Sequence, residues 1–230
     1  MSKAVRVKAG GVDPDAVAAK ARELGVMGWV RPTGEIHAEG EAVDALLAFL
    51  GEPETERATV EGHEQFGIRG VSAGVFVVQE HQATAHHYDV RLEVDGVMRS
   101  WAVPKGPSLD PAAKRLAVEV EDHALSHNDF ESSSVIVWDR GTYEQGGRVA
   151  WPEALERGHA VFVLHGEKLR GGFALQRTSR GAKPQWLLIK RRDDEARPGS
   201  DIVSERPESV VSGRTLAEVI GPTQERPEQE

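Results

Sequence analysis

The segment Phe76–Arg91, with the sequence FVVQEHQATAHHYDVR, places ionisable side chains at strand spacing directly after an apolar run. Side chains alternate between the two faces of a strand. The even-numbered residues of Tyr88–Val94 therefore share one apolar face, and the odd-numbered residues of His87–Glu93 share an ionisable face. This pattern constrains the segment to a strand with the core on one side and polar chemistry on the other.

The ionisable face has the composition of a metal site. His81 ends the apolar run before the strand, and a short connection can bring it back beside His87 and Asp89. Two imidazoles and a carboxylate suit manganese, iron or zinc, and three protein ligands leave positions open for water and substrate. Arg91 follows on the same face, where a guanidinium can hold phosphate oxygens bidentately. The pattern therefore predicts metal-assisted phosphoryl chemistry.

Two other interpretations of these residues stay open. Single histidines on an exposed strand face are commonly solvated polar residues without a ligand. In addition, His87 and Asp89 with the distant His123 fit the two-histidine, one-carboxylate set of non-haem iron oxygenases. The oxygenase interpretation leaves His81 and Arg91 without a role.

Composition limits the class of protein. The chain has 230 residues, 39% hydrophobic and 28% charged, which allows one large or two modest domains. No apolar run approaches the roughly 18 residues of a membrane-spanning helix, and the N-terminus lacks a signal-peptide core, so we expect a cytoplasmic protein without membrane contact. With no cysteine, any metal must use histidine and oxygen ligands. The net charge of -9 argues against a surface that coats nucleic acid, but allows a local basic site for one polynucleotide end.

The first seventy residues predict an α+β sandwich. Asp13 can cap a helix that begins at Pro14 and stops at Gly25. The other expected elements are strands and one helix, at Val5–Val7, Trp29–Arg31, Glu35–Ala38, Glu41–Leu50 (the helix) and Thr59–Ile68. The order strand, helix, strand, strand, helix, strand is that of a ferredoxin-like split βαβ fold.

The text ARELGVMGWVR, the helix EAVDALLAFLG and the closing FGIR resemble acylphosphatase over residues 4–69. The family's catalytic arginine is replaced by Pro14, and Pro32 stands in place of its catalytic asparagine. The resemblance therefore implies an acylphosphatase-like fold that is catalytically inactive and serves packing or partner contact.

The rest of the chain predicts a β-barrel. After a small-residue linker, Asp95-Gly96 is the strongest hairpin signal. In Arg115–His123 an apolar set at 116, 118 and 120 alternates with an ionisable set whose polar end can join the site. Further strands are expected at 135–138, 160–164, 172–177 and 186–190, with only a short helix at 152–157. Many antiparallel strands favour a barrel. The fold class is thus mainly β, with an acylphosphatase-like domain at 1–70, a barrel at 75–194 and a polar mobile tail at 195–230.

Residues 75–194 resemble the 3′-phosphoesterase domain of bacterial DNA ligase D. The resemblance is carried by FVVQEHQATAHHYDVRLEVDGVMRSWAVPKGPSLDP, KRLAVEVEDH, VIVWDRGTYE and WLLIKRRDD, in that order. It implies a metal-dependent nuclease and phosphatase, favouring manganese with zinc as the alternative, that removes a 3′ phosphate or a terminal 3′ ribonucleotide. It also implies DNA or RNA–DNA 3′ ends as substrates, and a separate DNA ligase and end-joining proteins as partners in DNA repair.

The same resemblance assigns roles to individual residues. It gives His81, His87 and Asp89 to the metal. It gives Arg91 and His123 to the scissile phosphate, and its supporting positions fall on Gln79, Lys105, Arg115 and Glu121.

Two departures from the family affect substrate choice and rate. His127 replaces a tyrosine four residues after the histidine of the EDH motif, and imidazole changes charge near neutral pH where phenol does not. A glycine-rich loop of the family is shortened to Glu131–Ser134. The chain is not itself a ligase, because Glu93 stands where the Lys-x-Asp-Gly motif needs its lysine. A non-catalytic protein that binds DNA 3′ ends is the alternative function.

We expect residues 1–70 to fold but to hydrolyse benzoyl phosphate no faster than background, because Pro14 and Pro32 replace the donors that an acyl-phosphate site needs. The measurement is steady-state phosphate release from benzoyl phosphate. Turnover that is abolished by a substitution within residues 1–70 would contradict the expectation.

Overall fold

The computed structural model describes residues 3–221, which form two compact units. The first unit comprises residues 1–73 and 144–160, and the second comprises residues 74–143 and 161–230. The predicted barrel range of 75–194 is therefore interrupted. Residues 144–160 group with the first unit because Arg148 and Arg157 bond to its loop, Arg148 to the Glu61 carbonyl and Arg157 to the Glu64 carboxylate at 2.7 Å each.

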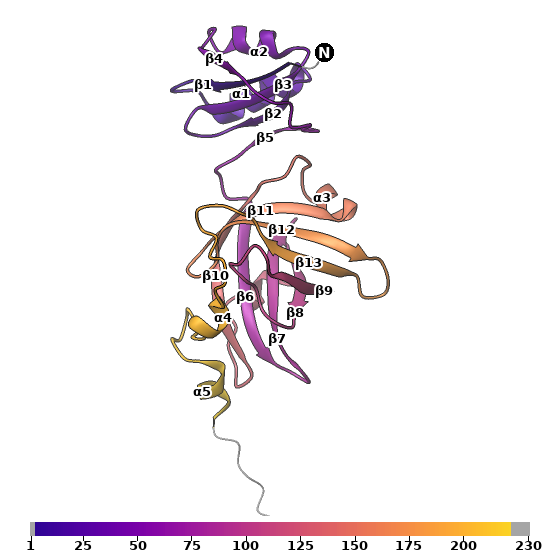
Figure 1. The fold of residues 1–230 in the computed structure, drawn as a ribbon, viewed down its shortest axis with the longest axis vertical. Helices are drawn as coiled ribbons and strands as arrows, with labels where there is room; N and C mark the ends of the chain where they lie inside the picture. Colours follow the sequence, from indigo (N-terminus) through magenta and orange to yellow (C-terminus); the bar gives the residue numbers. More distant parts are fainter. Residues whose placement is uncertain (1–2, 222–230) are drawn as a thin grey trace, which may run out of the picture. The chain divides into compact units, whose positions relative to one another are not determined.

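The first unit contains a five-stranded sheet with two helices (Figure 1). The elements are β1 (Lys3–Lys8), α1 (Pro14–Glu23), β2 (Met27–Val30), β3 (Glu35–Gly40), α2 (Val43–Phe49), β4 (Thr55–Arg57) and β5 (Phe66–Ile68). The strand order is β4-β1-β3-β2-β5, with β5 parallel to β2. The element order up to β4 matches the prediction. The single closing strand expected at Thr59–Ile68 is wrong, because β4 and β5 lie on opposite edges and the segment between them crosses the sheet.

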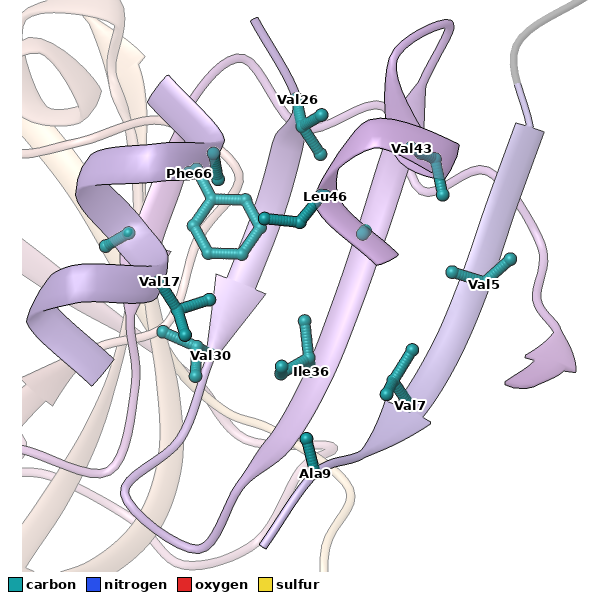
Figure 2. Packing of buried hydrophobic residues seen from close by; sticks show 13 residues of the cluster. Val5, Val7, Ala9, Val17, Val26, Val30, Ile36, Val43, Leu46 and Phe66 are labelled. Atoms are coloured by element: carbon teal, nitrogen blue, oxygen red, sulfur yellow. The ribbon is translucent and has the colours of Figure 1, made fainter. Parts of the chain in front are cut away.

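Both helices cover one face of this sheet, and the apolar alternation explains which face (Figure 2). Val5, Val7 and Ile36 point toward α1 and α2 in a core of buried residues. The alternate residues His37 and Glu39 therefore point away from the helices, yet they are also buried, at 0% and 3% exposure. A helix-free sheet face that buries charged groups must satisfy them with hydrogen bonds.

The second unit is a closed antiparallel barrel, as the sequence predicts (Figure 1). Its strands are β6 (Gly74–Gln82), β7 (His86–Val94), β8 (Val97–Val103), β9 (Lys114–His123), β10 (Val135–Gln145), β11 (His159–Gly166), β12 (Arg170–Ser179) and β13 (Gln185–Lys190). They close in the order β10-β11-β12-β13-β9-β8-β7-β6. Three fully buried aromatic residues, Trp101, Trp186 and Phe173, pack in its interior. The short 3-10 helix η1 (Leu125–His127) also belongs to this unit, whereas α3 (Glu153–Arg157) lies in the 144–160 segment of the first unit.

The expected hairpin between β7 and β8 is present, with Asp95 at φ 51° and Gly96 at φ 80°. Two successive positive φ values are those of the type I′ turn that joins twisted strands. In strand β9, by contrast, the apolar side chains lie on the outer face of the barrel and the polar ones on the inner face. Its apolar set points outward, with Leu116 at 42% exposure, while Glu119 points inward and accepts a hydrogen bond from Trp186 Nε1 at 2.8 Å.

The predicted mobile tail is wrong for residues 195–221, and residues 222–230 of that prediction lie outside the described part. The segment forms α4 (Ile202–Glu205) and α5 (Leu216–Ile220), and it buries Ile202 and Leu216. It also satisfies polar groups of the barrel. The Arg206 carbonyl accepts from Trp138 Nε1 at 2.7 Å and from Lys168 Nζ at 2.8 Å. The polar composition of the segment concealed this role, because the partners are backbone carbonyls, which any sequence supplies.

Within residues 3–221, none of the helices is both long and apolar enough to cross a membrane.

A chain ending at residue 194 should be less stable than one ending at residue 221 by about 3 kcal/mol, because it loses the buried Ile202 and Leu216 side chains and the carbonyl acceptors of Trp138 and Lys168. The Lys168 side chain is 0% exposed. Urea unfolding of the two chains measures the difference. Equal midpoints with equal slopes would show that the segment does not stabilise the barrel.

Candidate metal centre

The predicted convergence of three ligands on the barrel surface is present. Strands β6 and β7 pair antiparallel with His81 opposite His87 and Gln79 opposite Asp89. Because directly opposed residues share a face, this register places the ligands side by side. The His81 and His87 ring centroids are 5.0 Å apart, and one ligand atom from each of His81, His87 and Asp89 lies within 4.8 Å of the others.

Asp89 holds the centre of the cluster. Its Oδ1 lies 3.4 Å from His87 Nε2, and its Oδ2 lies 3.9 Å from His81 Nδ1. Arg91 donates from Nη2 to Asp89 Oδ2 at 3.2 Å. Burial alone would raise the pKa of Asp89, but the His87 hydrogen bond and the Arg91 charge outweigh it and hold the pKa below its ordinary value. Asp89 is therefore a carboxylate, the form in which it can bind a cation.

The two imidazoles are held differently. Burial, and then the charge of His87, lower the pKa of His81, so His81 favours the neutral form that binds metals. The hydrogen bond to Asp89 raises the pKa of His87. The Nδ1 atom of His87 lies 2.9 Å from the Ala85 carbonyl, and a backbone carbonyl on Nδ1 commonly orients a histidine that binds metal through Nε2. The donor set, its spacing and this backbone contact fit a divalent ion.

Arg91 supplies donors beside the ligands. Its side chain is 6% exposed, and its Nε atom has no hydrogen-bond partner among residues 3–221. Burying an unpaired guanidinium N–H is costly unless a ligand uses it. An oxyanion next to Asp89 would provide the missing acceptor.

His123, which the resemblance assigns to the phosphate, lies on the outer face of the barrel because the strand register shifts. Odd-numbered residues of β9 point inward up to Glu119, but the β8–β9 register shifts between Met98 and Ser100, so His123 pairs with Met98 on the outer face. Its Nδ1 lies 3.2 Å from Ser100 Oγ, and Ser100 is directly opposite Arg91. Ser100 could not be recognised from the sequence, because its role depends on cross-strand register.

His127 and Gln79 lie close to His123 and to the η1 turn, and their assigned roles stay predictions. The His127 ring is 6.3 Å from that of His123, edge to face. Gln79 Nε2 donates to the carbonyls of His127 and Phe130, at 3.1 and 2.9 Å, so Gln79 holds the η1 loop against the cluster.

Three expected supporting residues are not brought into this network. Lys105 and Glu121 are exposed, and Arg115 is opposite the buried Leu188 on the other face of β9. Within residues 3–221, these three make no hydrogen bond or ion pair with the cluster. Their assigned roles remain predictions that need a bound substrate.

A second group in the N-terminal unit also has ligand atoms within 4.8 Å, namely His37, Glu39 and His63. Its atoms are already paired. Arg6 Nε donates to His37 Nδ1 at 3.0 Å, which leaves the proton of the neutral ring on Nε2, facing Glu39 Oε2 at 3.3 Å. Glu39 also accepts from the backbone N–H groups of Glu61, at 2.7 Å, and His63. A metal on His37 Nε2 would have to displace that proton, so this group is better described as a network that holds the 58–65 loop on the sheet.

Comparison with known proteins finds similarity over part of the barrel. Residues 79–177 match the family of the DNA ligase D 3′-phosphoesterase domain. All residues of the cluster described above, from Gln79 to His127, lie in this range. The N-terminal unit up to residue 73 lies outside it, so the acylphosphatase resemblance stays a prediction.

Three relatives carry the name multifunctional non-homologous end joining protein, or DNA repair protein, LigD. The Pseudomonas aeruginosa protein is 52% identical over 159 residues, which is 61% of this chain and 18% of that protein. The Mycolicibacterium smegmatis protein is 39% identical over 54% of this chain and 18% of its own length. The Mycobacterium tuberculosis protein is 40% identical over 52% of this chain and 16% of its own length. The chain thus spans less than a fifth of the relatives it matches.

We expect the purified protein to bind about one manganese or zinc ion per chain, and Asp89→Ala to lose it, because two neutral imidazoles alone compensate the charge of the ion poorly. Elemental analysis after gel filtration measures the content. His37→Gln is the control and should keep the ion. Unchanged metal in Asp89→Ala, or loss in a folded His37→Gln protein, would contradict the assignment.

Proposed function

We propose that this protein is a metal-dependent phosphoesterase that processes the 3′ ends of DNA in repair. It removes a 3′ phosphate or a terminal 3′ ribonucleotide and leaves a 3′ hydroxyl. The observation that carries the proposal is the joining of a ligand cluster, His81, His87 and Asp89, to a buried guanidinium with an unpaired N–H. The family match and the end-joining names of the relatives support the same chemistry.

The cluster needs a divalent ion, with manganese proposed and zinc as the alternative. When bound by His81, His87 and Asp89, the ion supplies a Lewis acid for the phosphoryl group. The protein's own contribution is to keep Asp89 ionised and His81 neutral, as their lowered pKa values indicate. The ligands lie on the same face of the neighbouring strands β6 and β7. No loop has to become ordered to bring them together, because both strands belong to a closed barrel.

Arg91 and His123 act on the phosphate. During phosphoryl transfer, charge builds on the equatorial oxygens and on the leaving oxygen. Arg91 is fixed by its hydrogen bond to Asp89, and its Nε, which has no partner within residues 3–221, is the donor that we assign to the phosphate. His123 is fixed by Ser100, directly across from Arg91 in the β7–β8 register. The two groups therefore approach one bound phosphate from β7 and β9, on either side of β8, and each can donate a hydrogen bond to it.

The shortened loop leaves the site accessible. Glu131 Oε1 accepts from Val137 N at 2.8 Å and is also bonded by Ser209 Oγ, so the start of the loop is tied to β10 and to the C-terminal segment. His127, the last residue of the η1 turn, is exposed. A duplex end can reach such a site more easily than one enclosed by a long loop. We infer that loss of the loop affects the choice of substrate more than the chemical step.

Arg91→Ala should lower kcat for release of a 3′ phosphate by roughly a hundredfold or more, as loss of one charge-stabilising donor does elsewhere. Affinity for duplex DNA should fall less, since several contacts supply it. His123→Ala should behave likewise. The measurement is hydrolysis of labelled DNA with 3′-phosphate and 3′-ribonucleotide ends, across a panel of divalent metals.

Arg140→Ala is a matched control, because Arg140 is an exposed arginine of the same barrel, paired with Asp129. It should keep the wild-type kcat. If the wild-type protein leaves both kinds of end intact with manganese but still shifts them in a gel, the function is end binding without catalysis.

A further inference from the structure

The outer face of β9 carries a row of apolar side chains beside the candidate metal centre. Leu116 is 42% exposed and Val120 is 36% exposed, with the half-buried Val118 between them. We call these three residues the β9 row. Scattered apolar side chains on a surface need no explanation, but a contiguous set with polar groups around it marks a binding surface.

The strand register fixes where the row lies. Asp89 on β7 is opposite Ala102 on β8, and Ala102 is opposite Val118 on β9. Two residues further along β7, on the same face, Arg91 is opposite Ser100, and Ser100 is opposite Val120. The row therefore lies two strand spacings, or about 10 Å, from the ligand and the arginine. Figure 1 shows these three strands as neighbours in the barrel.

The strand between them carries small side chains. Ala102 ends at Cβ and is half-buried, so it does not stand as a barrier between Asp89 and Val118, whereas Ser100 is buried beneath its contact with His123. The two ends of the row are basic. Lys114, which is exposed, precedes Leu116 on the same face, and His123 follows Val120 across the register shift. The proposed phosphate site on β7, a small residue on β8 and the apolar row on β9 thus follow one another across the three strands.

We propose that the β9 row holds the sugar and base of the nucleoside that carries the scissile 3′ phosphate. This inference rests on the proposed function. A nucleotide end has an anion at one side and the broad apolar face of a base at the other, separated by one sugar. The surface repeats that order over about the same span. Contacts with the face of a base, rather than its edge, do not distinguish sequence, so the row suits an enzyme that accepts any terminal base.

Continuity with the phosphate site favours a nucleoside over a protein partner. A protein surface would have to cover the metal centre in order to cover the row, because only Ala102 separates Val118 from Asp89. Apolar side chains such as leucine contact bases in other nucleic-acid complexes. The half-buried Leu187 lies opposite Leu116 on β13 and extends the strip away from the centre.

The test changes the row and the base together. Threonine at all three positions (Leu116→Thr, Val118→Thr and Val120→Thr) places a residue of high strand propensity at each, so the strand should be retained. The two substrates are duplexes with a 3′ phosphate, one on a normal terminal nucleoside and one on a terminal residue without a base. The threonine variant should raise KM about tenfold for the normal end, the effect of losing a few apolar contacts, and change KM little for the end without a base.

Isoleucine at the same three positions should restore the wild-type KM, and Val97→Thr, which alters another exposed valine of the barrel (38% exposed), should have no effect. Equal changes in KM on both substrates, or no change on either, would overturn the proposal. If the wild-type protein hydrolyses neither end, the proposed function fails. The same comparison made with dissociation constants, from fluorescence anisotropy of the two ends, then supports the row if only the normal end is weakened and rejects it otherwise.

Discussion

The candidate site depends on the antiparallel register between β6 and β7. That register places His81 opposite His87 and Gln79 opposite Asp89, so that ligands from two strands share one outward face. A slip of β7 by one residue would turn His87 and Asp89 into the barrel and leave His81 outside, since side chains alternate. The type I′ turn at Asp95-Gly96 fixes the next pairing, which sets Ser100 beside Arg91. Barrel closure then holds these strands without a free edge, and the geometry is set before any ion or substrate binds.

Much of this arrangement follows from the sequence alone, for a simple reason. The alternation of residues 86–94 and the short connection from His81 involve neighbouring strands, whose pairing is the local default. The barrel class, the capped helix at Pro14 and the β7–β8 hairpin follow from equally local signals. The strand pattern of residues 115–123 suggested that His123 can join the site, and the family resemblance gave His123 its role and added Gln79.

What the sequence could not supply depends on long-range pairing. The outward direction of the β9 row follows from where β9 lies in the closed barrel, and the register shift that returns His123 to the outer face is invisible without its partner strand. Packing of residues 195–221 relies on main-chain carbonyls that accept from Trp138 and Lys168, and composition does not reveal such acceptors. The grouping of residues 144–160 with the N-terminal unit depends similarly on Arg148 and Arg157.

The two histidine–carboxylate clusters show why residue type alone does not define a metal site. In the N-terminal unit, Glu39 accepts hydrogen bonds from backbone N–H groups, and Arg6 fixes the His37 tautomer. These polar groups therefore hold the 58–65 loop on the sheet. In the barrel, His81 has only a distant contact with Asp89, and the buried Arg91 retains an N–H without a partner within residues 3–221. A folded protein tolerates such unsatisfied groups where a ligand completes them. Hydrogen-bond saturation therefore separates a structural network from a site that is prepared to bind a cation and an oxyanion together.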